Sequence, residues 1–160
     1  MVIEPYDDSL LEDIVRLSLR AWAPVFESLR EAMLPAVYRA FFRDDWREAQ
    51  RRAVESVCAD NAMQVWVALE ESKTAGFVAL KLHPDDRMGE IHMIAVDPEF
   101  QRRGIATALT HHSVEWFKKA GMSITMAETG ADPGHAPARR AYEAAGFTRL
   151  PVARYFKSLT

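Results

Sequence analysis

The spacing of apolar and polar residues changes period several times along the chain. Apolar residues recur at helical spacing over residues 10–21, which predicts an amphipathic helix that ends or bends at Pro24. A second helical stripe runs over residues 35–57, and the many charged residues beside it indicate a solvated face. Ahead of both stripes, residues 2–4 form a short strand pattern that is closed by Pro5.

In the middle of the chain the pattern becomes that of β-strands. Residues 63–70 and 75–82 are rich in Val, Ala, Leu and aromatic residues, and the polar turn between them predicts a hairpin, with residues 90–96 as a third strand. The later pattern predicts a helix, a strand, a short helix and two terminal strands, at residues 105–120, 123–128, 138–145, 147–150 and 152–159. Strands that first pair in order and then cross over through helices are typical of a mixed sheet in an α/β or α+β fold.

The composition fits one globular domain, and we expect residues 1–160 to form it. Hydrophobic residues make up 49% and charged residues 27%, which fits neither a disordered nor a membrane protein. The net charge of −3 argues against a broad nucleic-acid surface. Cys58 is the single cysteine, so no disulfide forms within the chain, and no apolar run approaches the ~20 residues of a membrane helix. Since the start also lacks a signal-peptide pattern, we expect a cytoplasmic protein with no membrane and no nucleic-acid partner.

The most informative stretch is residues 91–106, in which a strand, a tight loop and a helix start follow one another. The strand stops at an Asp-Pro pair, and Gly104 opens the helix after a loop that contains Arg102 and Arg103. The first amides of a helix have no intrahelical partner and lie at the positive end of the helix dipole, so they stabilise an anion. A glycine at this place lets the backbone approach the anion closely. The stretch therefore predicts a site for a phosphorylated ligand.

Two common phosphate-binding motifs do not fit this loop. A nucleotide-binding P-loop has Gly-Lys-Ser/Thr, whereas residues 104–106 read Gly-Ile-Ala. A dinucleotide-binding fingerprint requires two further glycines that the loop lacks. A second motif narrows the remaining classes of protein that bind phosphorylated ligands. Residues 138–147 read Ala-Arg-Arg-Ala-Tyr-Glu-Ala-Ala-Gly-Phe.

Together, the loop and the second motif resemble the GNAT N-acetyltransferase superfamily. The acetyl-CoA loop of that family reads Gln/Arg-x-x-Gly-x-Gly/Ala, and residues 101–106 read Gln-Arg-Arg-Gly-Ile-Ala. Its later motif reads Ala-x-x-x-Tyr-x-x-x-Gly-Phe, which residues 138–147 match. The order of the predicted elements also agrees from Met63 onward. The resemblance implies a GNAT-type acyl-CoA N-acyltransferase fold, with a central, mostly antiparallel sheet that contains a splayed parallel pair and is flanked by helices.

The resemblance also implies acetyl-CoA as co-substrate and no metal. Backbone amides in the loop would hold the phosphates, the pantetheine arm would pair with the preceding strand, and an amide near Ile94 would stabilise the oxyanion. Read without the resemblance, the side chains of Ile94 and Val96 are core, and the two loop arginines are solvated charges. The residues implied to contact acetyl-CoA are Ile94, Ala95, Val96, Gln101, Arg102, Arg103, Gly104, Ile105, Ala106, Thr107, His135, Ala138 and Tyr142.

Two catalytic side chains follow from the same resemblance. Tyr142 is expected to protonate the leaving thiolate, since a phenol pKa of ~10 lies close to the ~8.5 of a thiol; without the matched motif this Tyr would be read as core. Glu90 occupies the position that serves as general base in the histone-acetylating branch, and it would act directly or through a water. The two-residue period of a strand predicts one shared face for Glu90, His92, Ile94 and Val96. His92 is the rival base, because an imidazole titrates near neutrality.

We expect the amine to attack directly in a ternary complex, because Cys58 lies far in the sequence from both motifs and a ping-pong reaction needs a placed nucleophile. The acceptor is a small amine or a protein amino group. Residues 9–57, the region that tends to form the acceptor site in this family, match no pattern that identifies it. Large aromatic side chains in this region are read as helix-packing core rather than as pocket lining: Trp22, Phe26, Tyr38 and Trp46. The family also suggests a homodimer.

The chain departs from the family pattern at two places, and its residues also allow two other functions. The family often has Asn where this chain has His135, and the loop over residues 129–137 is long for its place. The alternative function is a non-catalytic acyl-CoA-binding or sensor module on the same fold, and the presence of both Glu90 and Tyr142 argues against it. A nucleic-acid-binding protein that uses the paired arginines is disfavoured by the net charge.

Overall fold

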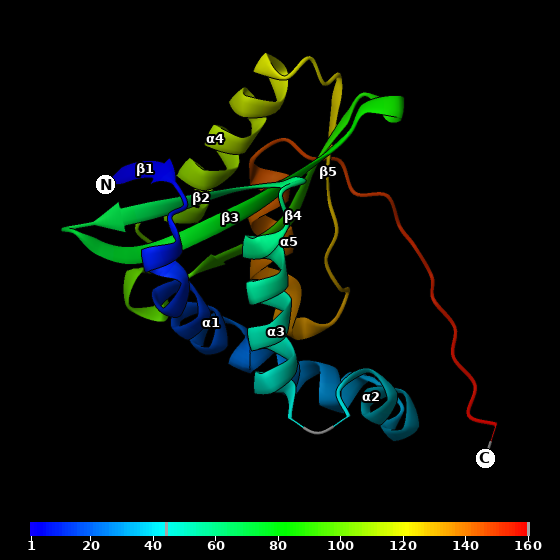
Figure 1. The fold of residues 1–160 in the computed structure, drawn as a ribbon. Coiled ribbons are helices and arrows are strands. Elements are labelled where there is room, and N and C mark those ends of the chain that lie inside the picture. Colours follow the sequence, from blue (N-terminus) through cyan, green and yellow to red (C-terminus); the bar gives the residue numbers. More distant parts are fainter. Residues whose placement is uncertain (44, 160) are drawn as a thin grey trace.

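Five strands form one mixed sheet in which each strand neighbours the next one in the sequence (Figure 1). The computed structural model describes residues 1–43 and 45–159. β1 to β4 pair antiparallel, and β4 and β5 pair parallel. The strands β1 to β5 span Val2–Pro5, Met63–Glu70, Lys73–His83, Met88–Val96 and Ile124–Ala127. The predicted mixed sheet, mostly antiparallel with one parallel pair, is confirmed.

Helices cover both faces of the sheet (Figure 1). α1 and α3 pack on one face and α4 packs on the other, while α2 follows α1 and α5 closes the helical part of the chain. The helices α1 to α5 span Leu11–Ala32, Pro35–Phe41, Trp46–Ala59, Ile105–Lys119 and Ala136–Ala144. Short 3-10 turns η1 to η4 span Asp8–Leu10, Pro84–Asp86, Pro98–Phe100 and Pro133–His135.

The two faces of the sheet belong to separate hydrophobic cores. Neighbouring residues of a strand point to opposite faces, so Phe77 and Val78 enter different cores. The core under α4 contains Val78, Leu80, Ile91, Val96, Ile105, Leu109 and Phe117. The core under α1 and α3 contains Ile14, Val15, Leu17, Val54, Val67, Phe77 and Ala95. Membership of one core or the other therefore tells which face a strand residue occupies.

Helix α4 packs against β4 at a glycine. A Cβ atom at Gly89 would stand 2.2 Å from Cδ1 of Phe117. The Phe117 ring, which is buried, fills the space that any larger residue at position 89 would need. This contact sets how closely α4 approaches the sheet. It thereby also positions the loop that precedes α4.

Two helix boundaries differ from the sequence pattern. α1 does not end at Pro24 but continues through it to Ala32. Residues on both sides of this proline are buried, Leu17 before it and Phe26 after it, so tertiary packing holds the helix despite the missing N–H. The stripe over residues 35–57 is two helices rather than one, because α2 ends at Phe41 and α3 starts anew at Trp46.

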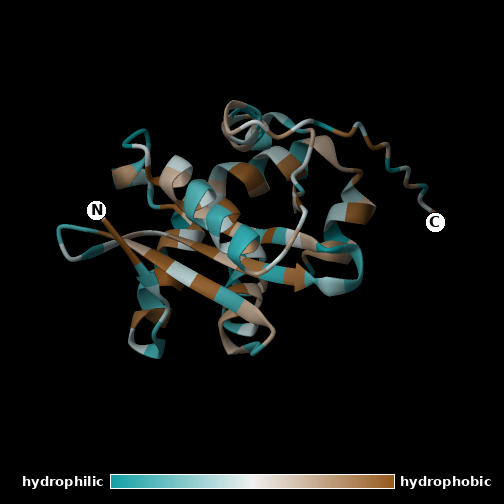
Figure 2. Cartoon of the chain, turned by 90° about the horizontal axis from the view of Figure 1, so that it is seen from above, coloured by the Kyte–Doolittle hydropathy of each residue, from teal (hydrophilic) through white to brown (hydrophobic). Residues whose placement is uncertain are grey.

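The two predicted C-terminal strands are absent, because residues 145–159 form neither helix nor strand. The apolar side chains that produced the strand pattern are exposed: Leu150, Val152, Tyr155 and Leu159 are 78–92% exposed. Figures 1 and 2 show that this tail runs away from the sheet. Its ring contact is between Phe156 and Phe41 of α2, with the centroids 5.9 Å apart.

Candidate active site

The parallel strands β4 and β5 separate partway along their length. Their pairing begins at Met88 opposite Ile124 and ends at Ile91 opposite Ala127, while β4 continues to Val96. The N–H of Asp97 donates to the carbonyl of Ala75 on the β3 side, at 2.9 Å. By the two-residue alternation, the backbone groups of Ile94 and Val96 point to the opposite edge, toward β5. The predicted splay is confirmed, and it leaves a strand edge open to an extended ligand.

The side chains of Ile94 and Val96 pack into the core under α4, so the residues serve the core and the open edge together. Gln101 already uses one group of this edge, because its Nε2 donates to the carbonyl of Val96 at 3.1 Å. Ala95 has the other orientation: it is buried under α1 and lies opposite Phe77. Ala95 would therefore support a ligand by keeping its strand neighbours in position, and its side chain would make no contact with the ligand.

The loop before α4 is fixed by backbone geometry that suits an anion. Asp97 is buried and accepts hydrogen bonds from the N–H of Glu99 and from Arg20, at 2.9 and 3.1 Å. Two loop residues have left-handed backbones, Arg102 with φ 61° and Gly104 with φ 81°. Gly104 is thus required for its backbone angle, since no atom lies within 4 Å of a Cβ built there.

Helix α4 begins directly after Gly104, so the amides of Ile105, Ala106 and Thr107 lie in its first turn and lack intrahelical partners. Arg102 and Arg103 are both exposed, and the Arg103 guanidinium lies 5.3 Å from the centre of the Phe100 ring. The structure therefore brings the predicted residues 101–107 together at one helix N-terminus, where backbone amides and two cations suit phosphate groups.

Tyr142 lies in α5 and packs against the core under α4. Its ring centre is 5.4 Å from that of Phe147. The helix ends at Ala144, and Gly146 follows in the turn with a φ of 88°. Burial raises the pKa of the Tyr142 phenol to about 12. The phenol is therefore protonated at neutral pH and has a proton to donate. Ala138 stands one turn earlier in the same helix.

Strand β4 contains a bulge that overturns one prediction about Glu90. The register with β3 shifts where Ala79 faces Met93 and Leu80 faces Ile91, which leaves His92 without an opposite residue. Because Ile91 lies in the core under α4, its neighbour Glu90 points to the face of α1. The prediction that Glu90 shares a face with Ile94 is therefore wrong, since the extra residue inverts the alternation.

Glu90 is held between two histidines. Its Oε2 lies 2.6 Å from Nε2 of His83, and its Oε1 lies 3.0 Å from Nδ1 of His92. Burial acts to raise the pKa of Glu90, but the hydrogen bonds from the two imidazoles outweigh it, so the pKa lies below its usual value. The sequence analysis did not identify His83 as a site residue. The register of the hairpin reveals it, because Lys81 lies opposite Glu90 and His83 is the next β3 residue on the same face.

Comparison with known proteins decides the family. A family model described as the acetyltransferase (GNAT) family matches residues 22–147, most of the chain. The chain belongs to this family. It is 32% identical over 94 residues to a mycothiol acetyltransferase of Thermomonospora curvata, a match that covers 59% of this chain and 31% of the relative. It is 37% identical over 82 residues to an uncharacterised N-acetyltransferase, YsnE, of Bacillus subtilis, over 51% of this chain and 54% of the relative. The chain thus spans about a third to a half of these curated relatives.

Solved structures show that the GNAT fold extends over the whole chain. The ribosomal-protein-S18-alanine N-acetyltransferase of Escherichia coli superposes with a TM-score of 0.71 at 21% identity, over 99% of this chain and 84% of that one. An aminoglycoside N-acetyltransferase solved in complex with CoA superposes with a TM-score of 0.63 at 14% identity, over 99% of this chain and 100% of that one. At these identities the likeness shows the fold alone.

At the GNAT motif position that often holds Asn, this chain has a histidine that is hydrogen-bonded within the loop before α5. His135 precedes α5, and its Nδ1 lies 2.5 Å from Oδ1 of Asp132. The other oxygen of Asp132 accepts from Ser28 of α1 at 2.8 Å, and Ser28 Oγ in turn accepts from the N–H of Gly134 at 2.9 Å. Arg139 donates to the carbonyls of residues 130 and 132. The long loop over residues 129–137 is therefore tied to α1 by polar bonds.

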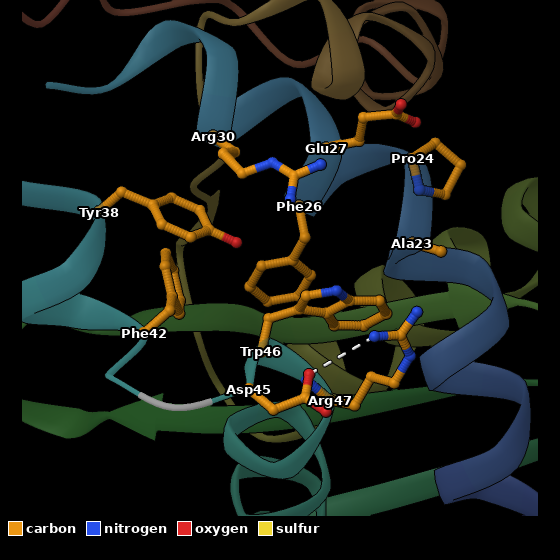
Figure 3. Close-up of a pocket in the computed structure, with 10 residues that line it drawn as sticks. All are labelled: Ala23, Pro24, Phe26, Glu27, Arg30, Tyr38, Phe42, Asp45, Trp46 and Arg47. Carbon is orange, nitrogen blue, oxygen red and sulfur yellow. Dashed lines mark hydrogen bonds and ion pairs between the residues drawn. The ribbon is translucent and has the colours of Figure 1, made fainter. Parts of the chain in front are cut away.

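Two hollows lie along the second half of α1 and share Pro24 and Glu27. One measures ≈ 510 Å³ and has a partly aromatic wall (Figure 3). In this hollow, Phe26 stacks on Trp46 with ring centres 4.6 Å apart. The expectation that these aromatic side chains only pack the core is corrected, because Phe26 is buried and also lines the hollow, together with Tyr38 and Trp46. The other measures ≈ 530 Å³ and lies between α1 and Pro133 and Gly134 of η4.

Two further features concern the described residues, 1–43 and 45–159. Among them no cluster of His, Cys, Asp and Glu is arranged to hold a metal ion. Among the same residues, no helix combines the length and the apolar character that a membrane crossing requires.

Proposed function

We propose that this protein is an acetyl-CoA-dependent N-acetyltransferase with a single catalytic domain over residues 1–160. The observation that carries the proposal is the juxtaposition of an open strand edge at Ile94 and Val96, an amide-lined helix start after Gly104, and a protonated phenol at Tyr142. An extended thioester-bearing arm with phosphates at one end fits this series of groups. The membership in the GNAT family supports the same activity.

Acetyl-CoA would be held chiefly by the backbone. The N–H and C=O groups of Ile94 and the N–H of Val96 would pair with the amides of the pantetheine arm, as an added strand does, while the carbonyl of Val96 already accepts from Gln101. The amides of residues 102–107 would bind the phosphates, with the two loop arginines adding charge. His135 and Ala138 would border the arm from the start of α5. The reaction needs no resident metal, because the thioester is already an activated acyl group.

The acetyl group would pass directly to the amine. A ping-pong route needs a thiolate or another ready nucleophile, but burial raises the pKa of the Cys58 thiol to about 11. That thiol is protonated at neutral pH, and it lies in α3 among residues of the α1-side core. Tyr142 would protonate the departing thiolate. The proton of the attacking amine would be taken up in the group around Glu90.

The acceptor is an amine, and we place its body in the hollows along α1. Glu27 lines both hollows, so a carboxylate stands at their common wall to meet a cationic amine. The aromatic wall of Phe26, Tyr38 and Trp46 suits an acceptor with an apolar or aromatic portion. Both a small molecule and a protein amino group present such a combination.

The activity is tested by the release of free thiol from acetyl-CoA, first in buffer and then with a panel of aliphatic, aromatic and peptide amines. Amine-dependent release above the rate without enzyme is the expected result. Calorimetric titration of acetyl-CoA separates binding from turnover. Binding without release by any amine would support the non-catalytic module instead, and absence of both would refute the proposal.

We further propose a homodimer in the cytoplasm. The exposed apolar side chains of the tail, Leu150, Val152, Tyr155 and Leu159, support association with a second copy, since burying them is favourable. The free Cys58 fits a reducing compartment. Light scattering should give twice the chain mass, and the double variant Leu150→Asp, Val152→Asp should give the chain mass. A monomeric wild type at 50–100 μM, roughly a hundredfold above a typical stable-dimer Kd, would refute the dimer.

A further inference from the structure

Glu90, His83 and His92 form one hydrogen-bonding unit in which donors and acceptors have fixed places. An ionised carboxylate accepts hydrogen bonds and donates none. Each imidazole must therefore present an N–H to Glu90: the Nε2–H of His83 to Oε2 at 2.6 Å, and the Nδ1–H of His92 to Oε1 at 3.0 Å. In the neutral rings, the lone pairs that remain are Nδ1 of His83 and Nε2 of His92. The carboxylate thus fixes the tautomer of both rings.

We infer that His92 Nε2, rather than the carboxylate of Glu90, takes the proton of the attacking amine, and that Glu90 and His83 are positioning residues. The inference rests on the proposed acetyltransferase function and assigns the proton acceptor within it. It follows the logic of a catalytic triad, in which a carboxylate orients an imidazole and stabilises the cation that forms.

The place of His92 in the sheet favours it over His83. His92 is the bulge residue of β4, directly after Ile91, the last residue that pairs with β5. It therefore stands where the two strands begin to separate and where the thioester would lie. The backbone of His83 faces Met88 near the turn of the hairpin, about four residues or roughly 13 Å along the strand from His92, although both imidazoles reach the same Glu90 carboxylate.

The chemical state of Glu90 disfavours it as the base. Both of its oxygens hold an N–H donor, and its side chain is 18% exposed, half the 36% of His92. The two donors favour the ionised form, which makes the carboxylate a weak proton acceptor near pH 7. Within the described residues, Nε2 of His92 has no hydrogen-bond partner, so it is free to meet an amine.

Few other charges act on this unit. Lys81 of β3 faces Glu90, and Met126 of β5 stands opposite it on the other side. Exposed charged groups lie at the ends of the neighbouring strands: Asp85, Asp86, Arg87 and Glu128. On the face covered by α1, Arg20 of that helix is paired with the buried Asp97 that follows β4. An imidazolium at His92 is therefore balanced mainly by the Glu90 carboxylate.

The proton and bond changes balance with this assignment. The ammonium form of the acceptor gives one proton to Nε2 of His92, and the neutral nitrogen attacks the thioester carbonyl carbon. The C–N bond forms and the C–S bond breaks, and the thiolate takes the phenol proton of Tyr142. The second proton on nitrogen returns to the Tyr142 oxygen, and His92 releases its proton to water.

The test is the pH dependence of kcat/KM for thiol release in four proteins. Wild type should show an ascending limb that reports the proton acceptor. His92→Gln should abolish that limb and lower kcat/KM by ~10²–10⁴. Glu90→Gln should keep the limb and move it to lower pH, because the imidazolium loses its counter-ion. His111→Gln, an exposed histidine of α4 outside the site, is the matched control and should leave the profile unchanged.

The opposite pattern would overturn the inference. If Glu90 were the base, Glu90→Gln would abolish the limb and His92→Gln would keep it. A second readout does not depend on activity: the nitrogen chemical shifts of His92 in the wild type should show the Nδ1–H tautomer, and the Nε2–H tautomer would contradict the geometry. A wild type that neither binds acetyl-CoA nor releases thiol refutes the acetyltransferase function itself, which this pair of measurements distinguishes from a wrong proton acceptor.

Discussion

Replacing Tyr142 by Phe isolates one oxygen atom of the proposed mechanism. The described residues offer the Tyr142 hydroxyl no hydrogen bond, so its removal breaks no bond of the folded chain. The ring keeps its contacts with Phe147 and the core under α4. We therefore expect the free energy of unfolding to change by less than about 0.5 kcal/mol and the Kd for acetyl-CoA to stay the same.

The effect on turnover follows from the pKa of the phenol. Burial raises the pKa of the phenol to about 12. This value lies well above the ~8.5 of a free thiol, so full proton transfer to a solvated thiolate is uphill by about 5 kcal/mol. The proton therefore moves only when C–S cleavage is advanced, and the gain from the phenol lies at the low end for general acids. We expect Tyr142→Phe to lower kcat by about 10- to 100-fold, or about 1.4–2.7 kcal/mol of transition-state stabilisation.

The measurement is kcat for thiol release at saturating acetyl-CoA, with Tyr155→Phe as the matched control. Tyr155 is 91% exposed in the tail, so the same atomic deletion there should leave kcat unchanged. An unchanged kcat in Tyr142→Phe, together with an unchanged Kd, would refute the assignment of Tyr142 as general acid. A large loss of thermal stability in that variant would instead refute the claim that its hydroxyl is without a structural role.

Three further predictions follow from single residues. The pKa of Glu90 is lower in the folded chain than its ordinary value of 4.5, so the ionised carboxylate stabilises the fold above that pH and this stability is lost as the pH falls through the folded pKa. The melting temperature of Glu90→Gln should therefore depend less on pH below about 4.5 than that of the wild type, and an identical dependence would contradict this. Gly89→Ala should cost about 1–3 kcal/mol by overpacking against Phe117, and Phe117→Leu in the same chain should recover part of it in denaturant unfolding. In Gly104→Ala the alanine would have to adopt a φ of 81°, and strain of about 1–2 kcal/mol should weaken acetyl-CoA binding about 5- to 30-fold in calorimetry. Gly121→Ala, at the other end of α4, is the control and should lower the stability of the fold without weakening binding.

The donor side of the site was accessible from the sequence because its signals are local. An Asp-Pro stop, a left-handed glycine and a helix start within ten residues are set by the backbone preferences of those residues themselves, and the structure has each of them between Asp97 and Ile105. Tyr142 likewise belongs to a short helix that ends at Ala144, just before the left-handed Gly146, and one motif of the GNAT family contains both Tyr142 and Gly146.

The acceptor side was not accessible in this way, because its features depend on pairing between distant segments. The helix through Pro24 survives only because Leu17 and Phe26 are both buried against other elements. The loop after β5 is ordered by Ser28, more than a hundred residues earlier. No periodicity within residues 9–57 reveals that Phe26 and Trp46 stack to line a hollow.

The periodicity of the sequence thus determined the mixed α/β class, and turn chemistry determined the backbone of the loop before α4. The resemblance to the GNAT family supplied the splayed strand pair and the proposed role of Tyr142. Only the tertiary structure decided which face Glu90 occupies and that His83 joins it. The physical reason is the bulge at His92: one unpaired residue inverts every later side chain of β4, and its position is fixed by hydrogen bonds to β3 rather than by any preference of its own.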